Sequence, residues 1–473
     1  MIVLNVRRIK KNERMDIKEI MKKDRAAADT IADLMKKQFK LRPWAQLERE
    51  YNQKKHPVMD KALYPDKKKE KVTRITRGWQ KLAVKRMSGL LFGTPVQRIY
   101  DAHDDEGQQK AASIMEAIFK ANRIDSVNRD RCKQLYASCE ILTIWYAQEA
   151  DVMYAEEPSR LKLRCVSYSP MGGSELYPLF DEYNDLIALS VKYSRTEGND
   201  TINYFETYAA EEHVRWVQIG GWQEELREPI SIGKISGVYA MRPEPAWEDE
   251  SDNVYEAEWA LSRNGNYLRK NARPNWVVCS DEKNVGQGST VNKDNDGVAF
   301  LHYPKDAKVG YETWAQAIDS LKFHVDTIKQ NFFMQLQLPD ISYENMKSAP
   351  MSGESRKMMF LDAQQKATDE SGIWEEFFSR EVNVVKAHMK NMYPSLSAAI
   401  DALQVSVQIT PFQINDTSER VQMLSNATGG MQIMSQKTAV KRLGMVDDVE
   451  AELEQIANEQ ESSTSSLFNE PTE

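Results

Sequence analysis

The chain has 473 residues, 41% of them hydrophobic and 28% charged, and its 63 basic and 71 acidic residues give a formal net charge of −8. This length is sufficient for two or three domains with apolar cores, and the ten tryptophans argue against disorder throughout. A protein that grips nucleic acid through its phosphates is usually basic. Tight, static DNA binding is therefore disfavoured, whereas loose enclosure of DNA is allowed.

The mean hydropathy of −0.62 and the lack of any run of roughly 20 apolar residues predict a soluble protein that does not cross a membrane. Residues Met1–Arg8 place only a few apolar residues before a basic cluster, which is the wrong order and length for a secretory signal. The cysteines form no CxxC pair and have no histidine at ligand spacing, so we expect reduced, structural thiols. They are Cys132, Cys139, Cys165 and Cys279.

The first third of the chain is predicted to be helical, because apolar residues recur at spacings of three and four. Pro43 ends the first helix, and the proline-containing segment 44–66 is predicted to be irregular. Gly93 followed by Thr94-Pro95 ends the second helix. The predicted helices are 13–40, 72–92, 108–121 and 126–146.

Between residues 161 and 239 the apolar period changes to two, which predicts an antiparallel β region. Glycine-rich turn signals separate its strands. Gly220-Gly221 is predicted to be a hairpin turn rather than a phosphate-binding loop, because no helix follows it.

A helix is predicted at 244–272, and two short strands at 276–279 and 298–303 flank a Gly/Asn/Asp-rich insert at 281–297. Two long helices follow at 311–337 and 353–392. The loop between them contains Pro339, Pro350 and Ser352-Gly353, so neither helix can continue through it. This loop is the most site-like feature of the sequence.

The C-terminal part begins with a predicted strand at 405–412. Three helices are predicted next, and the polar tail at 462–473 is predicted to be disordered. The predicted helices are 418–428, 431–443 and 447–461.

No catalytic, metal or cofactor site is predicted. The chain has no phosphate-binding GxxxxGK[ST] motif and no HExxH, and its six histidines never stand at ligand spacing. The acidic clusters 104–106 and 248–250 could bind a hard cation or do acid and base chemistry. They lack partner residues, so surface charge is the better interpretation.

Four stretches are informative when taken in chain order. Residues 77–96 end a helix in a Gly-Thr-Pro-Val turn, and 232–274 lead from a strand into a helix that stops at Pro274. Pro350–Ser355 gives a Ser-Gly start to a long helix, and 434–454 contain Ser-Gln-Lys-Thr-Ala and then Asp-Asp-Val-Glu-Ala-Glu-Leu. In this order they resemble the portal (head-to-tail connector) proteins of tailed bacteriophages, in the siphophage-type branch.

The resemblance implies an α+β, mainly helical portal fold with a wing, a stem, a clip, a tunnel loop and a crown. Carried over by position, the wing is 1–243 and 353–415, the stem helices are 244–272 and 311–337, the clip is 273–310, the tunnel loop is 338–352, and the crown is 416–461, before the disordered tail 462–473.

The resemblance also implies a function and partners. About twelve copies would form a ring at one capsid vertex, a dodecamer through which double-stranded DNA passes without sequence preference during packaging and ejection. The implied partners are the terminase large subunit, the major capsid protein and scaffold, and the head-tail adaptor or neck protein, with no membrane. The protein is expected in the virion, and in the host cytoplasm during assembly.

Two sets of site residues follow from these positions. The tunnel loop carries one cation, Lys347, against Asp340 and Glu344, so its grip on DNA is expected to be weak. The alternative is that the loop only connects two helices. The predicted DNA-channel residues are Asp340, Glu344, Asn345, Met346, Lys347, Ser348, Ser352 and Gly353. The predicted partner-docking residues of the clip are Asp281, Glu282, Lys283, Asn284, Lys293 and Asp294.

Two other classes remain open. A head-tail adaptor or scaffold-like protein would differ from a portal in forming no ring. A DNA-processing enzyme with scattered carboxylates would hydrolyse ATP or cleave DNA.

Overall fold

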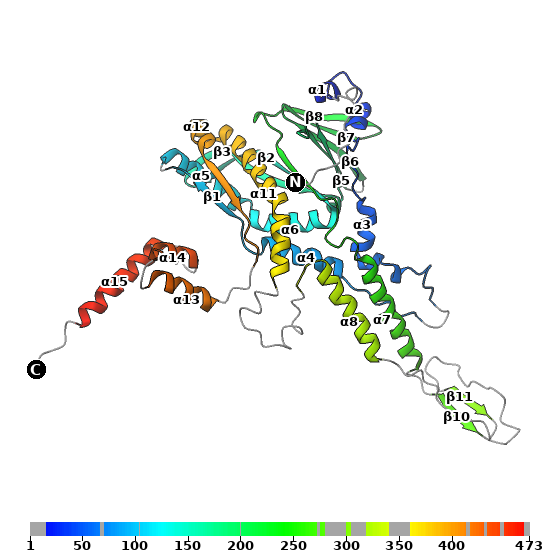
Figure 1. Ribbon diagram of the computed structural model, residues 1–473. Helices are drawn as coiled ribbons and strands as arrows, with labels where there is room; N and C mark the ends of the chain where they lie inside the picture. The colour runs from blue at the N-terminus through cyan, green and yellow to red at the C-terminus, as the bar shows by residue number, and fades with distance from the viewer. Residues whose placement is uncertain are drawn as a thin grey trace, which may run out of the picture. The chain divides into compact units, whose positions relative to one another are not determined.

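The structure, a computed structural model, is drawn with its helices and strands in Figure 1. Its contacts divide the chain into two units that are described separately. Unit 1 is built from Met1–Asp340 and Asp362–Phe412, and unit 2 from Ile341–Leu361 and Gln413–Glu473. The residues that the structure describes are 16–66, 71–103, 105–198, 200–271, 275–279, 299–303, 318–339, 360–412, 417–429, 433–444 and 449–467.

The first predicted helix, 13–40, is two short helices in the part that the structure describes. They are α1 (Ile17–Ile20) and α2 (Ala27–Leu34). The Thr30 hydroxyl donates to the Ile20 carbonyl at 3.2 Å and so takes the acceptor that a continuous helix would offer to Asp24. The buried residues Ile20, Met21, Ile31 and Leu34 still share one apolar cluster. Apolar spacing therefore predicted burial correctly but missed the break.

The segment predicted to be irregular is partly helical. Helix α3 covers Trp44–Tyr51, and two 3-10 turns follow at Gln53–Lys55 and Pro57–Met59. Pro43 is the N-cap of α3, with φ −62° and ψ 140°. A proline at the start of a helix costs no intrahelical hydrogen bond, so this residue begins a helix as well as ending the preceding segment.

Helix α4 covers Trp79–Phe92 and not the predicted 72–92. Residues 71–78 are not helical and run along helix α7 (Ser251–Asn271). Alternate amides of this segment donate to side chains one turn apart on α7, at Thr73–Asn266 2.7 Å, Ile75–Ser262 2.9 Å and Arg77–Glu258 2.5 Å. In a helix that starts at 72, the Thr73 and Ile75 amides would have no intrahelical acceptor. The side chains of α7 satisfy these amides and that of Arg77, so the polar face of α7 stabilises the extended path.

Helix α5 (Glu106–Ala121) agrees with the prediction, whereas α6 (Ile124–Ser138) ends well before residue 146. Cys139 has a left-handed backbone with φ 66°, and strand β2 (Glu140–Tyr154) follows at once. The first six residues of β2 are all buried. A strand buried on both faces lacks the period of two, which explains the overextended helix prediction.

The predicted antiparallel β region is confirmed. It forms a three-stranded sheet in the order β3-β2-β9 and a five-stranded sheet in the order β4-β5-β6-β7-β8. Gly220, with φ 68°, lies in the predicted hairpin turn between β7 and β8. The strands are β3 (Glu157–Tyr168), β4 (Glu175–Phe180), β5 (Leu186–Glu197), β6 (Asp200–Ala209), β7 (Glu212–Gln218), β8 (Trp222–Pro229) and β9 (Gly237–Met241).

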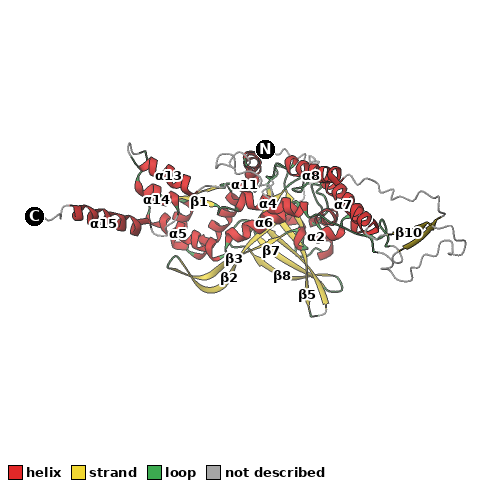
Figure 2. Ribbon diagram, turned by 90° about the horizontal axis from the view of Figure 1, so that it is seen from below, coloured by secondary structure: helices red, strands yellow, loops and turns green. Residues whose placement is uncertain are grey.

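Unit 1 is layered. One face of the five-stranded sheet, with Phe205 and Trp216, packs against α1 and α2. Its other face, with Val191 and Tyr193, packs against Leu142 of the three-stranded sheet. The opposite face of the three-stranded sheet packs against the helices, and Figure 2 shows α4, α5, α6 and α11 gathered on that side of β2 and β3.

Helix α11 (Leu361–Met392) lies in the largest apolar cluster of unit 1. Its Trp374 packs edge-on against Phe92 of α4, with ring centroids 4.9 Å apart. The prediction began this helix at 353, and residues 353–359 lie outside the described ranges. Helix α12 (Ser397–Ala402) then leads to β12 (Gln404–Gln408), which pairs antiparallel with β1 (Gln97–Asp101).

The expected unpaired thiols are confirmed for Cys132, Cys139 and Cys165, of which the first two are buried. Burial raises the pKa of Cys139 to about 12 and that of Cys165 to about 11. These cysteines are therefore protonated and unreactive at neutral pH. The side chain of Cys279 is outside the described part of the chain.

Unit 2 contains three helices among its described residues: α13 (Thr417–Thr428), α14 (Gln436–Leu443) and α15 (Val449–Leu467). Ser435 caps α14 by accepting from the Thr438 amide at 3.3 Å, and Gly444 ends it with φ 69°. Helix α15 continues past the predicted end at Glu461 into the segment predicted as a disordered tail.

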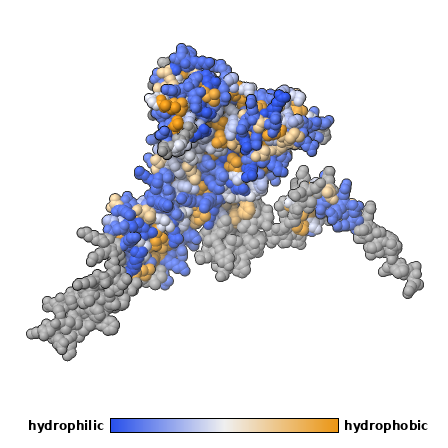
Figure 3. Space-filling model, turned by 180° about the vertical axis from the view of Figure 1, so that it is seen from behind, coloured by the Kyte–Doolittle hydropathy of each residue, from blue (hydrophilic) through white to orange (hydrophobic). Residues whose placement is uncertain are grey.

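Within the described ranges, no helix is both long and apolar enough to cross a membrane. Figure 3 shows the apolar residues on one face of the molecule as small areas among hydrophilic ones. Isolated apolar residues on a surface are ordinary and indicate no binding site by themselves.

Candidate functional site

The two predicted stem helices are helical where the structure describes them. Helix α7 starts at Ser251 rather than at 244, and α8 covers Ile318–Gln335. Figure 1 shows α7 and α8 side by side, with strands β10 (Asn275–Cys279) and β11 (Ala299–Tyr303) beyond their ends. The two predicted strands are confirmed and pair in parallel.

All fourteen predicted site residues lie outside the described ranges. The eight channel residues fall between Asp340 and Gly353, and the six docking residues fall between Asp281 and Asp294. Their side chains therefore remain predictions. The described residues show instead how the chain is held on either side of segment 340–359.

The end of α8 is fixed in the core of unit 1. Gln337 has a left-handed backbone with φ 52°, and the Leu338 amide donates to the Phe333 carbonyl at 2.9 Å. This is the six-to-one hydrogen bond of a Schellman motif, here with glutamine in the place that glycine usually takes. Leu336 and Leu338 are 7% and 4% exposed. The chain thus leaves α8 from a buried anchor two residues before Asp340.

The beginning of α11 is tied to that anchor. The Lys366 ammonium donates to the Leu336 carbonyl at 2.7 Å, at the C-terminal end of α8, where a cation is favourable. Burial lowers the pKa of Lys366. One turn further on, Glu370 accepts from Arg242 at 2.5 Å and from the Tyr136 hydroxyl at 3.1 Å. We name Tyr136, Arg242, Leu336, Lys366 and Glu370 the loop clamp.

Sequence reasoning missed the loop clamp. The available signal was the place of Lys366 between Ala363 and Ala367, which are both fully buried on α11. A lysine on the apolar side of a helix needs an acceptor for its ammonium. The acceptor is a backbone carbonyl thirty residues away, which no local pattern indicates.

Replacing Lys366 with Met is expected to lower the free energy of unfolding by about 1 kcal/mol, because the Leu336 carbonyl loses its charged donor. It should also make segment 340–359 a faster target for proteolysis, since α8 and α11 are no longer joined there. Urea unfolding and limited proteolysis measure the two effects. Lys322→Met, on the exposed surface of α8, is the control, and equal cleavage rates in both variants would contradict the prediction.

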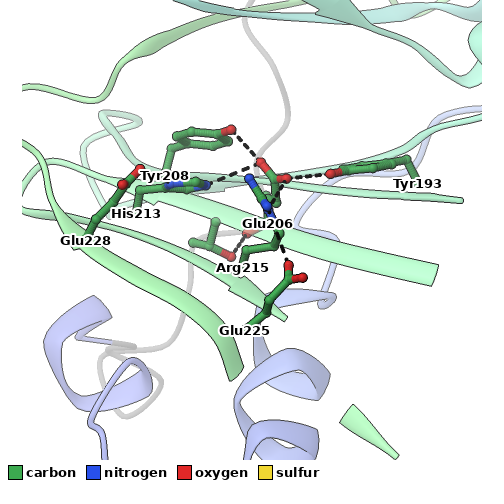
Figure 4. A network of polar contacts seen from close by, with 9 residues as sticks. Tyr193, Glu206, Tyr208, His213, Arg215, Glu225 and Glu228 are labelled. Carbon is green, nitrogen blue, oxygen red and sulfur yellow. Dashed lines mark hydrogen bonds and ion pairs between the residues drawn. The ribbon is translucent and has the colours of Figure 1, made fainter. Parts of the chain in front are cut away.

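A network of polar side chains lies on strands β5 to β8 and is drawn in Figure 4. Glu206 is 3% exposed and accepts hydrogen bonds from four side chains. The distances are 2.5 Å from Tyr193, 2.5 Å from Tyr208, 3.3 Å from His213 and 2.9 Å from Arg215. His213 also contacts Glu228 at 2.9 Å and stacks on Tyr208.

Burial alone would raise the pKa of Glu206, but hydrogen bonds from His213, Tyr193 and Tyr208 outweigh it and lower the pKa to about 2. Burial alone would lower the pKa of His213, and its bonds to Glu206 and Glu228 outweigh that and raise it. Glu206 is therefore an anion with its acceptor sites filled, and it has no free lone pair for a substrate. The network has the arrangement of a structural ion cluster in the sheet.

Among the residues that the structure describes, no group of three or more His, Cys, Asp or Glu side chains is arranged to hold a metal ion. The described residues thus define a mixed α and β protein whose helical pair α7 and α8 flanks a small strand pair in chain order, and whose helices α8 and α11 are joined by the loop clamp.

The comparisons with known proteins identify the family. The family model for phage portal protein, SPP1 Gp6-like, matches residues 38–466. The chain belongs to this family, as its motif order predicted. A phage portal protein is part of the virion, where it stands at the portal vertex of the capsid and conducts DNA.

Solved structures that match this chain come from gene transfer agent (GTA) particles. The virion of the native GTA particle matches with 10% identity and a TM-score of 0.37, covering 86% of this chain and 94% of that one. The neck of the empty particle, computed with C6 symmetry, gives 11% identity, a TM-score of 0.38 and the same coverage. The neck of the native particle, computed with C12 symmetry, gives 10% identity and a TM-score of 0.35. That match covers 85% of this chain and 93% of that one. No curated protein sequence matches the chain.

Proposed function

We propose that about twelve copies of this chain form a closed ring at one capsid vertex. In this ring α7 and α8 belong to the stem, 273–310 to the clip, 338–352 to the tunnel loop, and α13 to α15 to the crown, while the rest of unit 1 forms the wing. The ring passes double-stranded DNA inward during packaging and outward during ejection. The match to the portal family over residues 38–466 carries this proposal.

The exposed face of α8 supports a ring. Phe323 and Met334 are 74% and 68% exposed, and their spacing of eleven places them on one side of the helix. Large apolar side chains in such a row favour burial against another protein surface. In a closed ring, each copy offers this face to a neighbour through a heterologous contact.

The tunnel loop is proposed to approach the DNA most closely, with Lys347 opposed by Asp340 and Glu344. Few cations leave phosphates free to slide, because each neutralised phosphate adds affinity. The clip insert is proposed to dock the terminase large subunit during packaging and the neck adaptor afterwards. The wing is proposed to contact the major capsid protein and scaffold. No catalytic role is proposed, since hydrolysis of ATP would belong to terminase.

The mass and shape of the purified protein test the ring. We expect light scattering to give a mass near twelve times 54.4 kDa and negative-stain microscopy to show a central hole. Phe323→Asp combined with Met334→Asp should leave a folded monomer. Tyr183→Asp, at a turn where the tyrosine is 77% exposed, should leave the ring intact.

A wild-type chain that stays monomeric when co-expressed with capsid protein and scaffold would overturn the ring and favour a head-tail adaptor. ATP hydrolysis or DNA cleavage by the purified chain would favour a DNA-processing enzyme.

A further inference from the structure

A row of cations runs along one face of strand β3, and we call it the β3 cation row. Arg160, Lys162 and Arg164 occupy alternate positions of the strand, so their side chains leave it on the same face. Arg160 is exposed and the other two are partly exposed. Among the residues that the structure describes, no ion pair engages any of the three. In a chain whose formal net charge is −8, such a row indicates an anionic partner from outside.

Two further hydrogen-bond donors stand beside the row. On β2, Tyr146 lies opposite Arg164, and Gln148 lies opposite Lys162. Tyr146 is 45% exposed, and Gln148 is also exposed. A phenol and a side-chain amide can both donate to an oxyanion. The face therefore offers charge and directed donors together.

The five-stranded sheet leaves the row uncovered. Tyr168 lies on the same face of β3, and its ring stacks on Tyr193 of β5 with the centroids 5.7 Å apart. The row lies further along β3, toward the turn of the hairpin. Figure 2 shows the end of the β2–β3 hairpin extending away from the five-stranded sheet. The row is therefore accessible to a large partner.

The described carboxylates of β2 do not neutralise the row. Glu149 stands opposite Leu161 and so lies on the other face of the hairpin. Asp151, in the bulge between Glu149 and Val152, is exposed. Three cations against this one carboxylate leave the face positive.

Duplex DNA fits the row better than an acidic peptide does. Alternate residues of a strand are about 7 Å apart, so the row spans about 13 Å. One DNA strand carries a phosphate for each 3.4 Å or so of the helix axis, so phosphates meet the row in any register. An acidic peptide would need its carboxylates at the same alternate spacing. DNA is also the polyanion that a portal protein conducts.

We infer that the β3 cation row binds the phosphate backbone of duplex DNA without sequence preference, with Tyr146 and Gln148 as further donors. The row lies outside segment 338–352, so it is a DNA contact separate from the tunnel loop. A site with three cations binds weakly and loses affinity as salt is added. Each chain carries the whole row, so the contact does not depend on the proposed ring.

Fluorescence anisotropy with a short labelled DNA duplex, over a series of salt concentrations, tests the inference in the full-length chain. Each lost phosphate contact reduces the slope of log K against log salt by about 0.9. The combined variant Arg160→Gln, Lys162→Gln, Arg164→Gln should therefore reduce the slope by about 2.7 and weaken binding about tenfold or more at low salt. An unchanged midpoint of urea unfolding shows that this variant is folded.

The control removes three cations elsewhere on the surface. Lys22→Gln, Lys23→Gln and Lys40→Gln change exposed lysines outside the row and alter the net charge equally. They should leave the slope within about 0.5 of the wild-type value. Equal slopes for the row variant and this control would overturn the inference.

Two other results would also overturn it. A slope that falls in Lys347→Gln but not in the row variant would assign DNA binding to the tunnel loop alone. Polyglutamate that displaces the labelled duplex at a lower concentration than unlabelled DNA does would make an acidic protein segment the partner of the row.

Discussion

Replacing Glu381 with Ala is expected to lower the free energy of unfolding by about 3–5 kcal/mol, because it leaves the buried Arg131 without its counterion. The two side chains are 0% and 1% exposed, and Arg131 Nη2 lies 2.8 Å from Glu381 Oε1. The Trp145 indole donates to the same carboxylate at 3.0 Å. One carboxylate on α11 thus partners both α6 and β2.

The double variant Arg131→Met, Glu381→Leu separates the pair from its parts. Two apolar residues of similar volume remove both charges, so most of the lost stability should return. Urea unfolding of the single and double variants measures this difference. Arg380→Ala, beside Glu381 but in an ion pair whose side chains are 48% and 66% exposed, should change stability by less than about 0.5 kcal/mol. A double variant as unstable as Glu381→Ala would contradict the argument.

Local patterns predicted the elements of this fold where each element buries one face. Helix α5 and the strands from β3 to β9 follow their apolar period closely. Prediction failed where burial is two-sided, as in the first half of β2. It also failed where a distant partner decides the path, as for residues 71–78, whose amides are taken by α7.

The family could be predicted from the order of four motifs, and the site only by position. The interruption predicted between α8 and α11 rests on the prolines and the Ser-Gly pair of the sequence. The anchors on either side of it have no such signal, because Lys366 caps a carbonyl of another helix and Glu370 reaches Arg242 across the fold. Contacts between residues far apart in sequence have no local signature, so the loop clamp required the structure.

Replacing Glu206 with Gln is expected to remove about 3 kcal/mol of stability at neutral pH and progressively less as the pH falls. The pKa of Glu206 is lowered from 4.5 to about 2 in the folded chain, and each pKa unit corresponds to about 1.4 kcal/mol. A carboxyl group whose pKa is lower in the folded chain than in the unfolded chain contributes its full stabilisation at any pH above the unfolded pKa. That contribution is lost as the pH falls from about 5 toward 2.

The measurement is the difference in unfolding free energy between the wild type and Glu206→Gln across this pH range, because the difference cancels the other carboxylates. Glu225→Gln is the control, since Glu225 contacts only Arg215 in the network, at 3.5 Å, and its side chain is 41% exposed. The pH dependence from His213 runs in the opposite direction, because its pKa is raised in the folded chain. Its contribution to the free energy of unfolding is present below pH 6.5 and is lost as the pH rises through the folded pKa. A Glu206 difference that stays constant between pH 5 and pH 2 would show that the carboxylate holds no depressed pKa, and the ion cluster would then stabilise the sheet by packing rather than by charge.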